Sequence, residues 1–507
     1  MDSRIKKTKI NIIYSILLQI IKIFLLFLGK VIFVRKLGAE YLGINGLFSN
    51  LLSILSIADL GITTALMYGL YKPLAENDTK KITQYINFFK KVYLVIAIIV
   101  AITGIALIPF LKYIVNLPSD IPHIYLYYVI LLANSVLSYL FIDKTTLLMA
   151  DQKAYVINKV DIIFQIILFL LQIIVLTFSD SYTLYLLCNL LCTFIENLIK
   201  IKKAKEIYPY IKDNSVDKLD KKDKKEIITN VKSLMIYKIG GIIQSNTDNI
   251  LISIFVGTIT VGYYSIYTSI ISTITSFITL IFNSIKSSLG NFINDKNKSN
   301  EDKKEIFDAL EIYNFWLISF CSICFLVLVP DFITLLFGKE YLLGNGILIA
   351  IVLNFYTSNI RQNLWAYRET TGIFTETKYI TMVTAIINVF LSIILGKLYG
   401  VFGIVIATVI SRLVYAWWRE PQILYNKVFN AGSKEYIIKY ILRVFFVAFL
   451  YILIKYLVKF IRISNLIILL LMKAIICLAI TFISILLIYR KSNAMKILKN
   501  KILKKVD

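Results

Sequence analysis

Five charged side chains lie well inside long apolar stretches of this chain: Lys22, Asp59, Lys238, Asp248 and Arg361. A lone charge in the hydrocarbon of a bilayer costs about 2.5–3.5 kcal/mol on insertion scales, so such side chains usually face a protein interior or a wet cavity. The cations among them favour an anionic ligand. The guanidinium of Arg361 suits a diphosphate in particular, because it can bind phosphate oxygens in a bidentate manner.

Other polar residues recur around these charges at the spacing of one helix face. The four stripes are Asn11, Ser15, Gln19, Lys22 and Lys30; Asn45, Ser49, Ser56, Asp59 and Thr63; Lys238, Ser245, Asp248 and Asn249; and Asn354, Ser358, Arg361, Trp365 and Arg368. We predict that they line a polar cavity. Its predicted substrate ligands are Gln19, Lys22, Asn45, Lys238, Asn249, Arg361 and Arg368, and Asp59 and Asp248 are predicted sites for a coupling Na⁺ or H⁺. The Ser/Thr stripe of 261–286 is predicted to pack helix against helix instead.

Metal and redox chemistry find little support in the sequence. All five cysteines lie in apolar stretches, and the pair Cys321 and Cys324 has no histidine or second cysteine pair nearby. Buried thiols of this kind are common in membrane helices. The single histidine, His123, stands beside Pro122 and receives no role. We therefore predict no metal, no cofactor beyond the coupling ion, and no enzymatic activity.

Long apolar helices must position these side chains. Hydrophobic residues make up 58% of the 507 residues and the mean hydropathy is +0.74, above the roughly 45–50% apolar content of soluble domains. About fourteen stretches can cross a bilayer as helices. They are 10–34, 41–71, 92–111, 123–149, 155–178, 182–200, 233–256, 261–286, 312–332, 346–366, 377–398, 401–424, 437–458 and 464–489.

Most of the 56 Lys and Arg lie in connections on one side of these stretches, which predicts that both termini are cytoplasmic. The net charge of +25 is predicted to meet anionic membrane lipid and not nucleic acid. The predicted division is an N-lobe of six helices (1–200), a cytoplasmic linker (201–232), a C-lobe of six helices (233–425), two further helices (426–489) and a basic tail (490–507). A weak internal repeat supports the lobes: the segments 37–43 and 256–262, here called the glycine segments, share their glycine spacing.

The second half also carries a run of short motifs. They include Leu353-Asn354-Phe355-Tyr356, Arg361-Gln362, Tyr367-Arg368-Glu369, Gly372-Ile373-Phe374, Ile387-Asn388-Val389, Gly400-Val401-Phe402-Gly403 and Trp418-Arg419-Glu420-Pro421. Further blocks are Thr247-Asp248-Asn249-Ile250 and Val34-Arg35-Lys36-Leu37-Gly38. Together these motifs span nearly the whole chain. In their order along it, the chain resembles the polysaccharide flippases of the multidrug/oligosaccharidyl-lipid/polysaccharide exporter (MOP) superfamily. Glu369, where relatives often have Asp, is a departure from this pattern.

This resemblance implies two six-helix lobes in a V around a central cavity, followed by two extra helices. It implies the transfer of undecaprenyl-diphosphate-linked oligosaccharide units across a bacterial cytoplasmic membrane, for capsule or teichoic-type polymers, with a polysaccharide polymerase as a partner. Lys22 and Arg361 are the cationic residues to which it assigns function.

Two alternatives remain open at the level of sequence. A cation-coupled multidrug exporter of the same superfamily predicts an anionic cavity, which the lysines and arginine oppose. A membrane-embedded polymerase or ligase acting on the same lipid-linked sugars would need a substantial outer loop with catalytic side chains, and the outer connections here are short.

Overall fold

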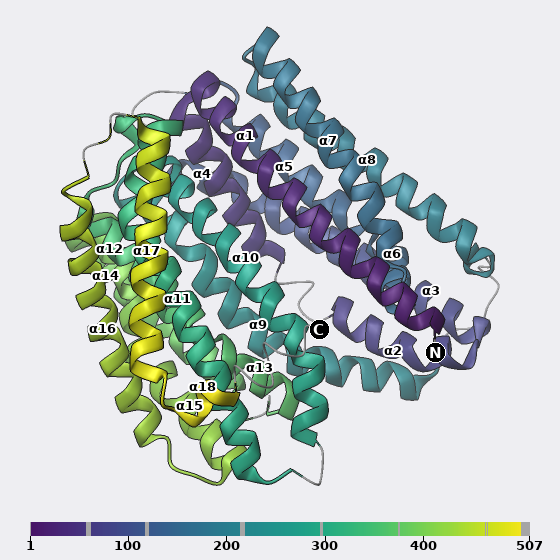
Figure 1. Cartoon of the computed structure of the whole chain (residues 1–507). Coiled ribbons are helices and arrows are strands. Elements are labelled where there is room, and N and C mark those ends of the chain that lie inside the picture. The colour runs from purple at the N-terminus through teal and green to yellow at the C-terminus, as the bar shows by residue number, and fades with distance from the viewer. Residues whose placement is uncertain are drawn as a thin grey trace. The chain divides into compact units, whose positions relative to one another are not determined.

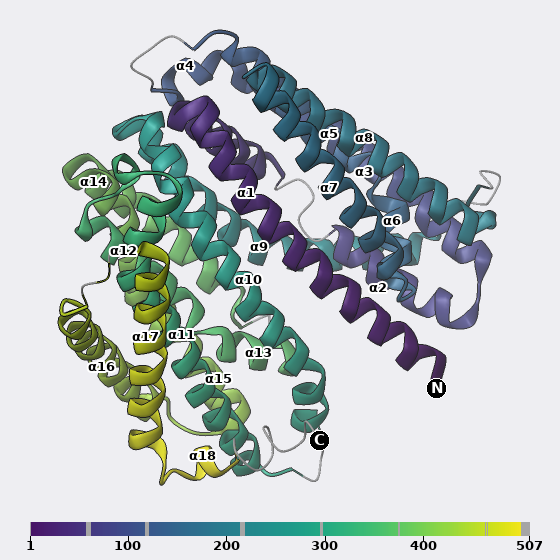
Figure 2. The same cartoon turned by 45° about the horizontal axis from the view of Figure 1, so that its top comes forward.

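The computed structural model describes residues 2–56, 62–116, 121–212, 219–294, 298–373, 376–461, 463 and 465–497, and its regular structure there is entirely helical. The chain forms two compact units, Met1–Gly262 and Tyr263–Asp507. Figures 1 and 2 show the helices of both units from two directions.

In the first unit, the described residues form nine α-helices and the start of a tenth. They are α1 (Asp2–Leu55), α2 (Ile62–Glu76), α3 (Thr79–Leu107), α4 (Leu111–Ile114), α5 (Ile124–Tyr139), α6 (Ile142–Ala150), α7 (Ala154–Phe178), α8 (Tyr182–Ile207) and α9 (Lys221–Phe255), with 3₁₀ turns η2 (Ile108–Phe110) and η3 (Pro209–Lys212). Helix α7 packs along both α1 and α8 (Figures 1 and 2).

The second unit is built around α11. Its elements are α10 (Thr258–Asn294), α11 (Asn300–Leu336), the 3₁₀ turn η4 (Lys339–Tyr341), α12 (Asn345–Asn359), α13 (Gln362–Thr371), α14 (Lys378–Ser411), the short π-helix η5 (Arg412–Ala416), α15 (Trp417–Leu424), the short π-helix η6 (Tyr425–Phe429), α16 (Lys434–Val458), α17 (Leu466–Tyr489) and α18 (Asn493–Ile497). Helix α17, yellow in Figure 1, packs on α11 and α16.

Side-chain caps mark where several helices begin. The Asp78 carboxylate accepts a hydrogen bond from the Lys81 amide at the start of α3, and the Ser181 hydroxyl accepts one from Leu184 at the start of α8. At the start of α11, Ser299 and Asp302 form a reciprocal capping box. Each cap satisfies a backbone N–H that has no partner inside the helix, and the helix therefore begins at a defined residue.

The predicted all-helical membrane fold is confirmed, and the chain is a multi-pass membrane protein. Within the described residues, nine helices are long and apolar enough to cross a bilayer, or ten if α5 and α6, which meet at 46°, count as one broken span. The described residues of all fourteen predicted stretches are mainly helical. The lower structural count arises partly because α1 and α14 each continue through a bend, at Gly38 (φ 84°) and Gly400 (φ 58°). Glycine suits both positions, since it lacks the Cβ that disfavours positive φ.

The predicted lobes and the two compact units differ in where α9 belongs. Residues 1–200 all lie in the first unit, but that unit continues through α9 to Gly262. The segment predicted as a linker, 201–232, contains the end of α8, η3 and the beginning of α9 in its described part. The V-shaped arrangement around a central cavity stays a prediction.

The two glycine segments pack against each other within the first unit. A Cβ atom on Gly43 would overlap the carbonyl oxygen of Thr258, and one on Gly262 would overlap the carbonyl oxygen of Ala39. Ala39 and Thr258 occupy equivalent places in the two segments, so the contact is reciprocal, as in an isologous interface. The repeat read from the sequence therefore corresponds to a close crossing of two helices that only glycine permits.

Candidate functional site

Arg361, the predicted diphosphate ligand, lies at the break between α12 and α13 and is only 7% exposed. Its Nε donates to Oε2 of Glu420 at 3.0 Å, and its Nη2 lies 2.5 Å from Oε1 of the same carboxylate. Glu420 is itself buried, in α15. The guanidinium also sits 5.3 Å from the ring centre of Trp365. Arg361 thus already has the bidentate anionic partner that a phosphate would supply, and its role as a substrate ligand stays a prediction.

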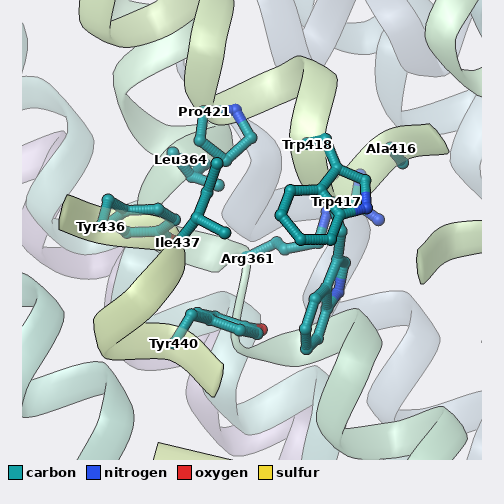
Figure 3. Close-up of a pocket in the computed structure, with 9 residues that line it drawn as sticks. All are labelled: Arg361, Leu364, Ala416, Trp417, Trp418, Pro421, Tyr436, Ile437 and Tyr440. Carbon is teal, nitrogen blue, oxygen red and sulfur yellow. The ribbon is translucent and has the colours of Figure 1, made fainter. Parts of the chain in front are cut away.

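A small pocket adjoins this ion pair (Figure 3). It is lined by Arg361 and by the aromatic side chains of Trp417, Trp418, Tyr436 and Tyr440, and its free space is about 10 Å³. Trp417 Nε1 and the hydroxyls of Tyr436 and Tyr440 are buried and have no hydrogen-bond partner among the described residues. A space of this size holds about one water molecule, which could bridge these groups. The pocket is far too small for a sugar.

A second buried ion pair joins helices that the sequence did not connect. Glu311 of α11 lies 2.7 Å from Nη1 of Arg443 in α16, and both side chains are buried. Arg443 Nε donates to the Tyr489 hydroxyl at 3.1 Å, and Asn363 donates to the Glu311 carboxylate at 3.4 Å. The network therefore ties α11 to α13, α16 and α17. Sequence reasoning missed it, although Arg443 is a charge inside the apolar stretch 437–458, the same signal that selected Arg361.

A polar cavity of about 240 Å³ lies over this network. Its charged lining is evenly divided between three cations and three carboxylates: Lys304, Lys439, Arg443, Asp308, Glu311 and Glu435. Two of these carboxylates already contact a cation, Glu311 with Arg443 and Glu435 with Lys439 at 2.6 Å. The charges therefore balance, and this cavity has no excess of cations with which to attract an anion.

The other predicted ligand of the second unit, Arg368, is also buried, and polar residues near it contact other helices. Arg368 is 4% exposed on α13, and its neighbour Glu369 lies 2.5 Å from Lys286 of α10. Arg412 donates to the backbone carbonyl of Asn354 at 3.1 Å and also to its side-chain oxygen. Polar contacts between helices thus account for much of the stripe predicted around Arg361.

In the first unit, the N-terminal residues of the α1 stripe also form hydrogen bonds to a neighbouring helix and turn. Asn11 donates to the carbonyl of Gln152 at 2.8 Å and accepts from the Tyr155 amide at 2.8 Å. The Ser15 hydroxyl accepts from Asn158 of α7 at 3.0 Å. This face of α1 therefore packs on α7 and on the turn before it.

Lys22 differs from the paired cations. It lies twelve residues into the apolar stretch 10–34, or roughly 18 Å along the helix at 1.5 Å per residue, close to the middle of a hydrocarbon core about 30 Å thick. Lys22 and Gln19 are half-buried, and neither has a hydrogen-bond or ion-pair partner among the described residues. Lys200 of α8, by comparison, contacts both Asp161 and Glu196 at 2.6 Å. Lys22 is thus a cation at membrane depth whose charge the described part of the chain does not compensate.

Five other predicted residues belong to this part of the chain. Asn45 accepts a hydrogen bond from the Tyr182 hydroxyl at 3.2 Å, which favours a role in packing. On α9, Asp248 is buried, and the half-buried Asn249 has a side-chain oxygen without a partner in the described region. Lys238 lies on the same helix, but its side chain is not among those described, and Asp59 lies outside the described residues.

A tyrosine just after α8 connects the end of that helix, outside the apolar stretch 182–200, to the turn between α6 and α7. The Tyr208 hydroxyl, just after α8, donates to the Asp151 carboxylate at 2.7 Å, and Lys153 lies 2.7 Å from the same carboxylate. Burial, together with this hydrogen bond, raises the pKa of Tyr208 above its ordinary value. The hydroxyl therefore stays protonated and keeps the end of α8 attached to the α6–α7 turn.

No protein-family model matches the sequence, and no curated protein matches it. Solved structures do. The lipid II flippase MurJ, in its inward closed conformation, superposes with a TM-score of 0.68 at 14% identity, covering 95% of this chain and 98% of MurJ. The chain therefore shares the fold of this structure. A point mutant of the MATE transporter VcmN of Vibrio cholerae gives a TM-score of 0.57 at 12% identity, covering 85% of this chain and all of VcmN. A MOP-superfamily transporter from Pyrococcus furiosus gives 0.53 at 14% identity, covering 82% of this chain and 96% of that one.

Proposed function

We propose that this protein is a flippase that moves undecaprenyl-diphosphate-linked oligosaccharide units from the inner to the outer leaflet of a bacterial cytoplasmic membrane. The product would serve the synthesis of capsule, another cell-surface polysaccharide or a teichoic-type polymer. The observation that carries the proposal is the fold. The superposition on a lipid II flippase covers 95% of this chain, and the superposition on the MATE transporter VcmN covers 85% of it. The uncompensated Lys22 supports it, because a diphosphate is the kind of group that a cation at membrane depth attracts.

The proposed mechanism is alternating access, in which the binding site opens first to the cytoplasm and then to the outside. The lipid tail stays in the bilayer while the sugar-diphosphate head crosses through protein, because the head cannot enter hydrocarbon without losing its hydrogen bonds to water. A membrane potential that is negative inside favours outward movement of an anion by about 2.3 kcal/mol per charge per 100 mV. Asp248 and Asp59 are the proposed sites for a Na⁺ or H⁺, if a counter-ion takes part.

The test is the flipping of a fluorescent undecaprenyl-diphosphate oligosaccharide in liposomes that contain the purified full chain. We expect flipping by the wild type and its loss in Lys22→Ala, with Lys112→Ala, an exposed lysine near a helix end, as the matched control. Removing Arg361 alone would strand Glu420 in the interior, so Arg361 is tested as the pair Arg361→Met/Glu420→Met. Absence of flipping by a folded wild type would refute the proposal.

The alternative functions predict different results in the same liposomes. A multidrug exporter of this superfamily would move cationic dyes and leave the lipid-linked sugar in place. A polymerase or ligase would form new glycosidic bonds, which mass spectrometry of the recovered lipid would detect. Either result would replace the flippase proposal.

A further inference from the structure

The polar cavity of about 240 Å³ beside the Glu311–Arg443 pair is enclosed mainly by the helices that follow the predicted C-lobe. One wall is the face of α11 that carries Lys304, Asp308 and Glu311, and η6 contributes Tyr425. Nearly all the other lining residues come from α16, the end of α17 and the start of α18, which pack on α11 (Figures 1 and 2). The cavity therefore exists because the two extra helices pack against α11.

This cavity lies at the ends of apolar stretches, at the depth of lipid head groups. Asp308 comes four residues before the stretch 312–332, and Tyr489 is the last residue of the stretch 464–489. A bilayer is about 40–45 Å thick with its head groups and about 30 Å thick without them, so the ends of the stretches lie among head groups. The distribution of Lys and Arg predicts that this end is cytoplasmic.

Two charged side chains of the lining, Lys304 and Asp308, are half-buried and form no hydrogen bond or ion pair with a described residue. The other four charged residues of the lining are already paired with one another. Lys304 and Asp308 are four residues apart on α11, so they share one face of the helix at a spacing of about 5–6 Å. In a helix an acid that precedes its lysine forms the better pair, and here the order is reversed.

Tyr425 adds a polar group without a partner. It is only 3% exposed and lines the cavity, and its hydroxyl forms no hydrogen bond with a described residue. Buried hydroxyls are normally hydrogen-bonded, because leaving one unsatisfied costs free energy. The cavity thus presents a carboxylate, an ammonium and a hydroxyl that a ligand could satisfy together.

The volume and the charges of the cavity define the ligand that fits. Pockets for drug-sized ligands measure about 300–1,000 Å³, so a cavity of 240 Å³ suits a smaller molecule or a lipid head group. A simple anion or cation would satisfy one of the two unpaired charges and leave the other without a partner. A zwitterion with an ammonium and a phosphate satisfies both and adds no net charge.

We propose that this cavity binds a phosphoethanolamine group. Its ammonium donates to the Asp308 carboxylate, and its phosphate oxygens accept hydrogen bonds from Lys304 and Tyr425. The group occurs as the head of phosphatidylethanolamine and as a free small molecule, and both share this chemistry. The site goes beyond the proposed function, because it takes a ligand other than the cargo and connects α11 to the two extra helices.

The test measures lipid binding by native mass spectrometry of the purified full chain. The probes are phosphatidylethanolamine and its N-acetylated derivative, which keeps the phosphate but has no ammonium. We expect the wild type to bind phosphatidylethanolamine about tenfold more tightly than the derivative. Asp308→Asn should remove this preference by weakening only phosphatidylethanolamine binding, because a hydrogen bond between charged groups is lost. Lys304→Gln should weaken the binding of both lipids about tenfold, and Tyr425→Phe a few-fold, because both lipids carry the phosphate.

Two matched controls lie on the same helix. Glu305→Gln and Lys303→Gln change charges of α11 that are outside the cavity lining, and both variants should bind like the wild type. A wild type without a preference for the ammonium lipid overturns the proposal. Equal weakening of both lipids by Asp308→Asn also overturns it, since Asp308 would then only support the local structure. So do control variants that bind as weakly as Lys304→Gln.

Competition with free phosphoethanolamine distinguishes the two sources. Displacement of the lipid from the wild type but not from Asp308→Asn supports the site with a soluble ligand, and retention of the lipid in excess competitor supports it with the lipid as the source. The site and the flippase also fail separately. A wild type that flips its cargo without preferring the ammonium lipid refutes the site alone, and one that shows the preference without flipping refutes the flippase alone.

Discussion

Breaking the Arg361–Glu420 pair on one side should cost far more stability than removing it whole. The two side chains are 9% and 6% exposed, and two contacts of 3.0 and 2.5 Å join them. Removing one partner of such a pair leaves an uncompensated buried charge, at a cost of about 3–5 kcal/mol, whereas apolar residues of similar volume at both positions are often neutral. Arg361→Met and Glu420→Met should each be strongly destabilising, and the double variant close to wild type.

This difference can be measured as the apparent midpoint of thermal unfolding in detergent, followed by fluorescence-detected size exclusion. For a unit of this size, about 2–4 °C corresponds to 1 kcal/mol, so each single variant should lose on the order of 10 °C. The comparison between variants matters more than any absolute value, because membrane proteins of this size often unfold irreversibly.

The exposed pair Lys439–Glu435 supplies the matched control, since its side chains are 54% and 67% exposed. Lys439→Met should leave the midpoint unchanged within error, because exposed pairs contribute little. Single Arg361 and Glu420 variants that unfold at the wild-type temperature would refute the reasoning. A double variant as unstable as the two singles combined would refute it as well, since the loss would then come from packing and not from a stranded charge.

Two further substitutions test other parts of the structure. Gly43→Ala should prevent normal folding, because the new Cβ would overlap the Thr258 carbonyl in a backbone crossing that has no flexible side chain to move. A normal yield of monodisperse protein would contradict this. The control is Gly241→Ala, whose added Cβ would meet no described atom within 4 Å beyond its own helix. Glu311→Gln should lower the unfolding midpoint by several degrees by stranding Arg443 in the interior, and a midpoint at or above that of the wild type would show that the Glu311–Arg443 pair is not needed for stability.

Local patterns were enough to predict the helices. Each of the fourteen stretches was recognised by its apolar length, and their described residues are mainly helical. This is expected because a helix in a bilayer satisfies its own backbone hydrogen bonds without reference to distant residues. The repeat could also be recognised from local sequence. Gly38 and Gly257 both adopt a positive φ, and this local backbone conformation favours glycine at each position. What the glycine spacing did not reveal is that the two segments cross each other.

The candidate site was predictable only in part. Helical spacing placed Lys22 on a polar face of α1, but it did not show that this face packs on α7. Arg361 was identified as a buried charge, yet its partner Glu420 lies 59 residues away and stands out in the sequence only as part of a motif. Arg443 and Glu311, separated by 132 residues, were missed altogether.

The sequence by itself determined that this is a multi-pass helical membrane protein with charges inside its spans. Both properties follow from the composition of short segments, each of which meets the bilayer on its own. Only the tertiary structure decided which of those charges are neutralised. Arg361 has a carboxylate against it and Lys22 has none among the described residues, although both looked alike along the chain. The difference depends on which helices pack together, because a charge is compensated only by groups within a few ångströms in space.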